Sequence, residues 1–126
     1  MTGTKVLLVD DEVEFTSSLE KVLKRRGFDV TVAAEGLTAL PLIAKEQFDF
    51  VLLDIKMPGM DGIQVLREIK RFSSNLPVIL LTGHYSLSEE EDTLQLGAFA
   101  YLHKPCPIGE LVDVIAKAVS GKATGS

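Results

Sequence analysis

Three short runs of the sequence are continuously apolar, and an aspartate or a threonine follows each of them. The runs are Val-Leu-Leu-Val at 6–9, Val-Leu-Leu at 51–53 and Val-Ile-Leu-Leu at 78–81. Strands that are apolar throughout are buried on both faces, as in a parallel sheet that helices cover on both sides. Residues 28–33 and 99–103 are two weaker strand candidates. The chain is therefore predicted to fold around a central parallel sheet.

Amphipathic segments lie between the apolar runs. Apolar residues recur at helical spacing within 15–23, 65–69 and 108–119, as they do on helices that bury one face. Gly27 and Gly97 are placed to end helices, because glycine adopts the left-handed conformation of a helix C-terminus without strain. Five strands alternating with five helices predict an α/β fold with helices on both faces of the sheet.

Two predicted helices begin with capping signals, and another contains a disruptive residue. Asp61 and Ser86 each precede a Gln or Glu by three residues, which is the pattern of a capping box. Pro41 lies inside the helical pattern of residues 36–46 and is expected to kink that helix or delay its start. Residues 86–96 have few apolar anchors beside a run of four acids, which we interpret as a solvent-exposed face.

Length and composition restrict the class of protein. The chain has 126 residues, so we assign one domain to residues 1–120 and a short polar tail, either a linker stub or a chain end, to residues 121–126. The net charge of −5 disfavours direct nucleic-acid binding, which usually requires a basic face. The sequence shows no membrane-spanning run and no signal peptide, and its single cysteine allows no internal disulfide. These features favour a cytoplasmic protein.

Reactive side chains follow four of the five predicted strands. Asp10 and Asp11 follow the first strand, Asp54 the third, Thr82 the fourth and Lys104 the fifth. In open parallel sheets, ligands bind beyond the carboxyl ends of the strands. These side chains are therefore expected to share one crevice.

Three carboxylates in one crevice repel one another. Two unit charges about 4 Å apart cost roughly 4 kcal/mol at the effective dielectric constant of a protein surface, so either one acid stays protonated or a cation offsets the charge. Mg2+ fits such a site, because it takes one or two carboxylates, retains several waters and engages phosphate. Lys104 would supply a further positive charge from the opposite side.

The residue types at these strand ends also match the requirements of phosphoryl transfer, which are positioning and neutralisation of oxygen charge. A carboxylate can serve as the nucleophile, and Asp54 is the candidate because it ends the central, most apolar strand. Lys104 and Mg2+ would balance the phosphoryl charge, and the Thr82 hydroxyl could donate a hydrogen bond to one phosphoryl oxygen.

Each of these residues has a simpler explanation when it is taken alone. Acidic pairs often cap helices, an aspartate or threonine after a strand is more often a turn or cap residue, and a single lysine is usually solvated. The combination favours a functional site, because four strand ends supply complementary groups to one crevice.

These residues resemble those of the receiver domain of two-component response regulators, and the resemblance runs from about Lys5 to Val119. The matching segments are Leu8-Val9-Asp10-Asp11-Glu12, Leu52-Leu53-Asp54, Met57-Pro58-Gly59-Met60-Asp61-Gly62, Leu80-Leu81-Thr82-Gly83, Gly97-Ala98, Tyr101-Leu102 and Lys104-Pro105. Each segment is weak alone, but together, in this order and spacing, they are highly specific. Pro41 in the second helix and Cys106 after the Lys-Pro pair depart from the family pattern.

The resemblance implies a flavodoxin-like sheet with strand order 2-1-3-4-5, and phosphorylation of Asp54 by a sensor histidine kinase or phosphotransfer protein. It implies Mg2+ held by Asp11, Asp54 and the backbone carbonyl of Lys56, with Asp10 acting mainly through water. Lys104, joined to the following proline by a cis peptide bond, would contact the phosphoryl group.

The resemblance also implies a conformational switch. Thr82 would move toward the phosphoryl group and Tyr101 would turn inward, which changes the face formed by residues 86–119. A downstream effector, an output domain or a second copy of the chain would bind that face. Such a domain is a signalling switch rather than an enzyme, because it catalyses only its own phosphorylation and slow dephosphorylation. Lys56 and His84 lie at positions that tune the lifetime of the phosphorylated state.

Two other functions fit parts of the pattern. A magnesium-dependent phosphohydrolase would share the acid, hydroxyl and lysine groups, but it usually has Asp-x-Asp after the first strand and a cap over the substrate. A flavin-binding electron carrier would need a hydroxyl- and glycine-rich phosphate loop where this sequence has Asp10-Asp11-Glu12. It would also need aromatic side chains to stack the flavin, and the chain has no Trp.

Overall fold

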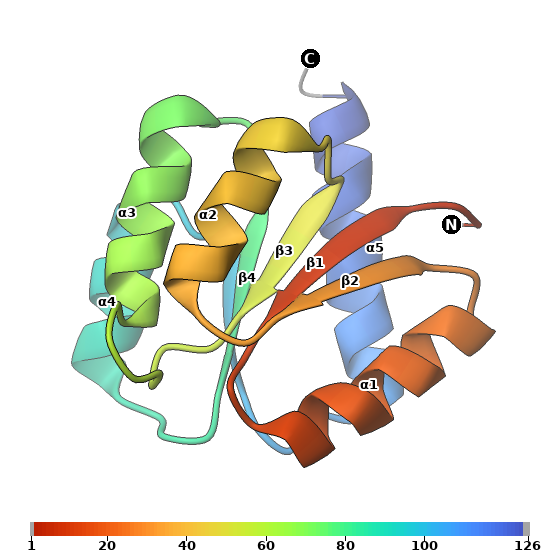
Figure 1. Ribbon diagram of the computed structural model, residues 1–126, viewed down its shortest axis with the longest axis horizontal. Helices are drawn as coiled ribbons and strands as arrows, with labels where there is room; N and C mark the ends of the chain where they lie inside the picture. Colours follow the sequence, from red (N-terminus) through yellow and green to blue (C-terminus); the bar gives the residue numbers. More distant parts are fainter. Residues whose placement is uncertain (1, 125–126) are drawn as a thin grey trace.

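Strands and helices alternate along the whole chain (Figure 1). The computed structural model describes the backbone of residues 2–124 and the side chains of residues 2–120. The strands are β1 (Lys5–Val9), β2 (Asp29–Ala33), β3 (Phe50–Leu53), β4 (Val78–Thr82) and β5 (Ala100–His103). The helices are α1 (Val13–Arg25), α2 (Gly36–Lys45), α3 (Gly62–Phe72), α4 (Leu87–Gln95) and α5 (Ile108–Thr124). The five predicted strands and the predicted amphipathic helices are confirmed.

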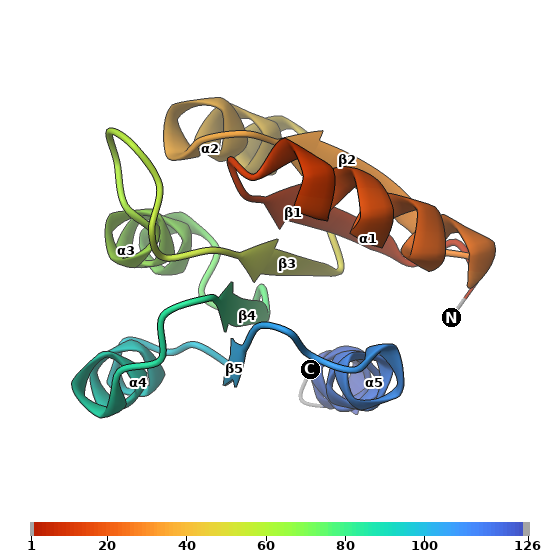
Figure 2. The same cartoon turned by 90° about the horizontal axis from the view of Figure 1, so that it is seen from below.

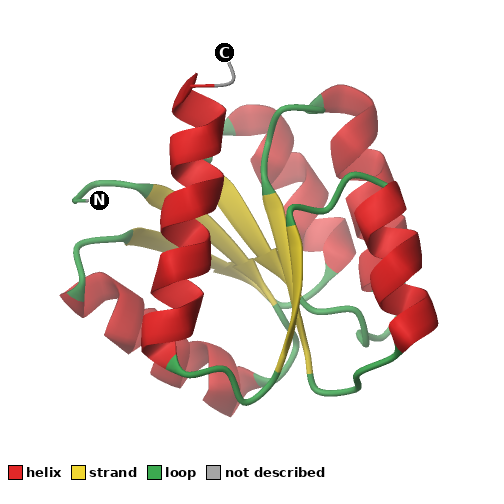
Figure 3. Cartoon of the chain, turned by 180° about the vertical axis from the view of Figure 1, so that it is seen from behind, coloured by secondary structure: helices red, strands yellow, loops and turns green. Residues whose placement is uncertain are grey.

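The strands form one parallel sheet in the order β2-β1-β3-β4-β5, which is the predicted order. Figure 2 shows α1 and α5 on one face of this sheet and α2, α3 and α4 on the other. The same division is visible from behind in Figure 3, where α5 lies in front of the strands. The predicted α/β fold with helices on both faces is therefore confirmed.

Alternate residues of β1 enter two separate cores. Leu7 and Val9 pack in the core beneath α2 and α3, whereas Val6 and Leu8 pack in the core beneath α1 and α5. Both sets of side chains are buried, because side chains of a strand alternate between the two faces of its sheet. This burial explains why the sequence of the strand is apolar without alternation.

The N-cap half of each predicted capping box forms. Asp61 accepts a hydrogen bond from the Gln64 backbone N–H at 3.0 Å, and the Ser86 hydroxyl accepts one from the Glu89 N–H at 3.3 Å. Gly97 follows α4 with φ of 105°, the left-handed conformation that glycine adopts at little cost. The Asp61 and Ser86 caps fix where α3 and α4 begin, and therefore where the loops after β3 and β4 end.

Pro41 lies inside α2, so of the two expected effects the delayed start is wrong, and the kink stays a prediction. The helix already begins at Gly36, where a Cβ atom would lie 2.5 Å from Val65 Cγ2 of α3. Close packing of α2 on α3 therefore requires glycine at this position. Pro41 has no N–H to donate to the carbonyl of Leu37, and Leu37 is an exposed residue.

The helix α4 buries little of its surface. Thr93 is its buried residue, whereas Leu87, Glu91 and Leu94 are exposed, in agreement with the predicted solvent-exposed face. The assignment of a domain to 1–120 and a tail to 121–126 stays a prediction. The backbone of α5 continues to Thr124, and the last two residues of the proposed tail lie outside the described residues. Among the helices that the structure describes, none is long and apolar enough to span a bilayer.

Candidate functional site

The carboxyl ends of the strands bring the predicted side chains to one edge of the sheet. The Asp10 N–H donates to the Ala33 carbonyl at 3.1 Å, and the Asp54 N–H donates to the Val9 carbonyl at 2.9 Å. These bonds continue the strand pairing one residue past β1 and β3, so both aspartates are rigidly placed. Asp10 is 3% exposed, Asp54 4% and Thr82 0%.

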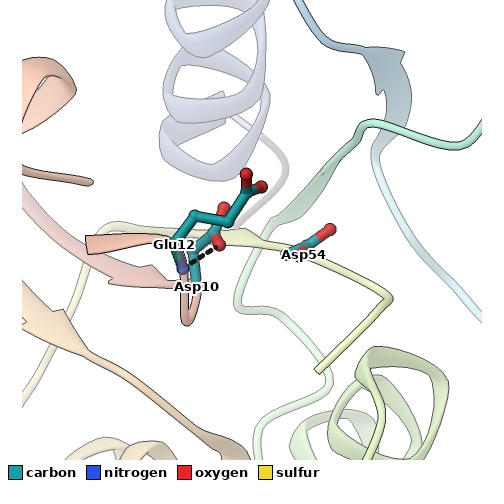
Figure 4. Close-up of side chains that lie close together, drawn as sticks. All are labelled: Asp10, Glu12 and Asp54. Carbon is teal, nitrogen blue, oxygen red and sulfur yellow. Dashed lines mark hydrogen bonds between the residues drawn. The ribbon is translucent and has the colours of Figure 1, made fainter. Parts of the chain in front are cut away.

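Three carboxylates meet at this edge, but they are not the three that the sequence analysis singled out. Carboxylate oxygens of Asp10, Glu12 and Asp54 all lie within 4.8 Å of one another (Figure 4). Asp11 is exposed and is not part of this cluster. Figure 4 shows the hydrogen bond that Asp10 Oδ1 accepts from the Glu12 N–H, at 2.9 Å.

Glu12 is the residue of the site that the sequence analysis missed. The signal that could have found it is the local turn, because an aspartate commonly binds the N–H two residues later. That bond brings Glu12 back toward the strand ends, whereas Asp11 stands between the two bonded residues and is exposed.

Lys104 enters the same cluster from β5. Its ammonium group lies 2.6 Å from Asp10 Oδ2 and 2.8 Å from Glu12 Oε1. Burial alone would lower the pKa of Lys104, but the hydrogen bonds to Asp10 and Glu12, together with the charges of Asp10 and Asp54, outweigh that effect and raise it. The same hydrogen bond and the positive charge of Lys104 lower the pKa of Glu12. The peptide bond between Lys104 and Pro105 is cis, in agreement with the expectation.

Asp54 is the strongly perturbed acid of the cluster. Burial and the neighbouring Asp10 carboxylate raise its pKa from an ordinary 3.8 to about 6, against the opposing effects of Lys104 and of the Ile55 and Lys56 backbone N–H groups. The shift has the direction expected for a crowded acid without a neighbouring cation, although burial contributes more to it than the charge of Asp10 does. The donor set also fits Mg2+, which prefers carboxylate oxygens and relieves their repulsion.

The remaining predicted residues surround the cluster. Thr82 Oγ1 accepts a hydrogen bond from the His84 N–H at 3.2 Å. Tyr101 is buried, and its hydroxyl accepts from the Ser86 N–H at 3.1 Å and donates to the His84 carbonyl at 3.4 Å. Tyr101 therefore points inward in the unmodified chain, and its predicted turn on phosphorylation stays a prediction. The Lys56 side chain points away toward α4, where its Nζ lies 3.4 Å from a Glu89 carboxylate oxygen.

Comparison with known proteins identifies the family. The model of the family described as "Response regulator receiver domain" matches residues 6–116 of this chain. The chain is 38% identical to sporulation initiation phosphotransferase F of Bacillus subtilis (strain 168), over 93% of this chain and 94% of that protein. It is similar to the crystal structure of the receiver domain of a sensor histidine kinase from Pseudomonas aeruginosa PAO1 with a magnesium ion coordinated in the active site cleft. That similarity has a TM-score of 0.86 and 30% identity, and covers 94% of this chain and 99% of that one.

Other relatives are longer than this chain. It is 37% identical to the transcriptional regulatory protein ZraR of Klebsiella oxytoca over 95% of its own residues, but it spans only 28% of that protein. The whole of the chain thus corresponds to one part of such a regulator. The match over most of its length, the sheet order and the acidic cluster at the strand ends agree, and the chain belongs to the receiver domains of two-component response regulators.

Proposed function

We propose that Asp54 accepts a phosphoryl group in a Mg2+-dependent reaction, and that this modification changes the partner-binding face of residues 86–119. The observation that carries the proposal is the environment of Asp54. Its carboxylate is buried at the end of the central strand, in a cluster with Asp10 and Glu12, and its pKa is raised to about 6. Perturbed acids of this kind concentrate at functional sites.

The surrounding residues have distinct roles in this proposal. Asp10, Asp11, Asp54 and the backbone carbonyl of Lys56 would hold Mg2+, which would neutralise charge on the phosphoryl oxygens. Asp11 is exposed on the loop and would complete this set. The magnesium ion in the active site cleft of the Pseudomonas relative supports the assignment.

The nucleophile in this proposal is a carboxylate oxygen of Asp54, which must be ionised to attack phosphorus. The leaving atom of the phosphodonor, oxygen in an acyl phosphate or nitrogen in a phosphohistidine, takes the electron pair of the broken bond to phosphorus, and an acyl phosphate remains on Asp54. Lys104 and Thr82 would donate hydrogen bonds to the phosphoryl oxygens. Tyr101 would transmit the change, because its hydroxyl is bonded to Ser86 at the start of α4.

The proposed partners follow from this role. A sensor histidine kinase or a phosphotransfer protein would supply the phosphoryl group in the cytoplasm, and an effector, an output domain or a second copy of the chain would bind residues 86–119. The chain carries exposed apolar side chains on that face, including Leu87, Leu94 and Phe99. Its overall charge of −5 supports the proposal that the domain itself does not bind nucleic acid. The proposed role is that of a switch, with no catalysis beyond its own phosphorylation and dephosphorylation.

The test is to incubate the chain with acetyl phosphate and Mg2+ and to measure its intact mass. One phosphoryl group should be added to the wild type, and none to Asp54→Asn or to the wild type with excess chelator. A phosphorylated Asp54→Asn protein would contradict the assignment of the acceptor. If acetyl phosphate reacts too slowly, beryllofluoride should still bind the wild type with Mg2+, and failure of both would overturn the proposal. Rapid turnover of small phosphate esters would instead favour a phosphohydrolase.

A further inference from the structure

The ammonium group of Lys104 is held on three sides. It donates hydrogen bonds to Asp10 at 2.6 Å and to Glu12 at 2.8 Å, and it lies 4.0 Å from the centre of the Phe15 ring. A cation over an aromatic face is attracted by the ring quadrupole, and more strongly where water is excluded. The Lys104 side chain is only 10% exposed, although that of Glu12 is 61% exposed.

Two of these three partners, Glu12 and Phe15, have no role in the proposed phosphorylation. Glu12 is the N-cap residue of α1, and its side chain makes no hydrogen bond to the backbone of that helix. Short polar side chains are the ones that cap helices well, so Glu12 contributes little as a cap. Its carboxylate instead reaches Lys104, which is 92 positions away in the sequence.

The direction of the Lys104 hydrogen bonds is important for the reaction at Asp54. Asp54 belongs to the same carboxylate cluster, but the carboxylates at hydrogen-bond distance from Lys104 are those of Asp10 and Glu12. An ammonium group has three N–H donors, and Asp10, Glu12 and the Phe15 ring already lie on three sides of the Lys104 ammonium. If Lys104 is to donate to a phosphoryl group on Asp54, Glu12 and that group compete for it.

We propose that Glu12 is a positioning residue, which together with Phe15 holds the Lys104 ammonium beside Asp10 and competes for it with a phosphoryl group on Asp54. The competition rests on the proposed function, whereas the holding of Lys104 does not. Glu12 thereby favours the unmodified form of the site. Removing it should leave Lys104 less ordered and should favour the form in which Asp54 carries a phosphoryl group.

The first measurement is the rate at which the Lys104 ammonium protons exchange with water. It is monitored by 15N NMR on the full chain, in buffer that contains chelator and no phosphodonor. Glu12→Gln should accelerate this exchange by about two- to fivefold, the range expected for loss of one partly exposed ion pair. Glu14→Gln removes the same charge from an exposed residue of the first turn of α1 that makes no ion pair in the described part of the chain, and it should leave the exchange unchanged. Unchanged exchange in Glu12→Gln would overturn the inference, whether or not Asp54 is phosphorylated.

The second measurement is the affinity for beryllofluoride in the presence of Mg2+, which mimics the phosphoryl group without a kinase. Glu12→Gln should bind about two- to fivefold more tightly than the wild type, and Glu14→Gln should not. Phe15→Leu changes no charge and should also tighten binding, because it removes the ring that holds Lys104. Glu12→Asp keeps the charge on a shorter side chain, and it should resemble Glu12→Gln rather than the wild type.

The outcomes separate the two proposals. If Glu12→Asp and Phe15→Leu bind beryllofluoride like the wild type, the charge of Glu12 acts only at a distance and the positioning role is wrong. If the wild type neither forms an adduct nor binds beryllofluoride, the proposed function fails and the competition fails with it. In that case faster ammonium exchange in Glu12→Gln would still establish that Glu12 holds Lys104.

Discussion

Gly62 lies directly against the backbone of Asp54. A Cβ atom at Gly62 would overlap the Asp54 carbonyl oxygen and would stand 2.6 Å from the Ile55 Cα atom. The Gly62 N–H also donates to the Ile55 carbonyl at 2.8 Å. The first turn of α3 is therefore packed onto the segment that leaves β3, and this contact fixes the backbone that presents the Asp54 carboxylate.

Replacing Gly62 with alanine should destabilise the protein. The added methyl group meets backbone rather than a flexible side chain, so the segment after β3 must move, at a cost of about 1–3 kcal/mol. Urea unfolding followed by circular dichroism would measure the loss. Gly109→Ala is the matched control, because a Cβ atom there has no neighbour within 4 Å, and the change should be neutral or stabilising by up to about 1 kcal/mol. Equal effects of the two substitutions would contradict the close approach.

The raised pKa of Asp54 predicts how stability depends on pH. The pKa of Asp54 is about 6 in the folded chain against an ordinary 3.8, so the folded state binds this proton more tightly than the unfolded state. Ionisation of Asp54 must therefore destabilise the fold as pH rises from about 4 to about 6. The loss is complete above pH 6 and is at most about 3 kcal/mol, from 1.36 kcal/mol per pKa unit.

Asp54→Asn isolates this contribution, because asparagine has nearly the same shape and does not ionise. In buffers with chelator, urea unfolding at several pH values should show Asp54→Asn more stable than the wild type at pH 7 and nearly equal at pH 4. The gap should open as pH rises from about 4 to about 6, because the pKa of Asp54 is raised from 3.8 to about 6 in the folded chain. A stability difference between the two proteins that does not change with pH would show that folding does not raise the pKa of Asp54.

A divalent cation at the acidic cluster should reverse that penalty. Mg2+ binds the folded cluster and has no such site on the unfolded chain, so it should raise the melting temperature of the wild type at pH 7. At a Mg2+ concentration ten times the Kd, the expected stabilisation is about 1.4 kcal/mol. Calorimetric titration would give the Kd, and a NaCl solution of equal ionic strength is the control. Asp54→Asn should show a smaller rise, and an equal rise in both proteins would place the cation elsewhere.

The sequence predicted the sheet because its strands are buried on both faces. Val6, Leu7, Leu8 and Val9 enter two cores in alternation, and burial on both faces leaves a continuous apolar run that no exposed strand would have. The parallel direction of the strands then predicted that Asp10, Asp54, Thr82 and Lys104, which follow four of them, lie at one edge of the sheet. These elements are predictable because each depends on local pattern and on the direction of parallel strands.

The features that the sequence did not predict depend on contacts between residues that are brought together only by folding. Glu12 joins the acidic cluster through a turn bond from its N–H to Asp10, and through a lysine 92 positions away, which no periodicity encodes. The early start of α2 was also not predicted, because it depends on the close packing of Gly36 against Val65 of α3. Both depend on neighbours that only the folded chain brings together.

The Tyr101 hydroxyl ties β5 to the start of α4, and its removal should loosen that helix. Tyr101→Phe leaves the Ser86 N–H and the His84 carbonyl without this partner, which should cost about 0.5–1.5 kcal/mol, the usual net contribution of a hydrogen bond. Tyr85→Phe is the control, because Tyr85 is exposed and its hydroxyl binds the Glu90 carboxylate at the surface. That change should cost less than about 0.5 kcal/mol.

Hydrogen exchange would show where the loss in Tyr101→Phe falls. Ser86 caps α4 through its own hydroxyl, and Thr93 is the buried residue of that helix, so few other contacts hold it in place. The amides of α4 should exchange faster in Tyr101→Phe, because local opening requires less free energy where fewer buried contacts resist it. The amides of α1, on the opposite face of the sheet, should change little. Equal acceleration in both helices would mean that Tyr101 stabilises the whole fold and does not specifically anchor α4.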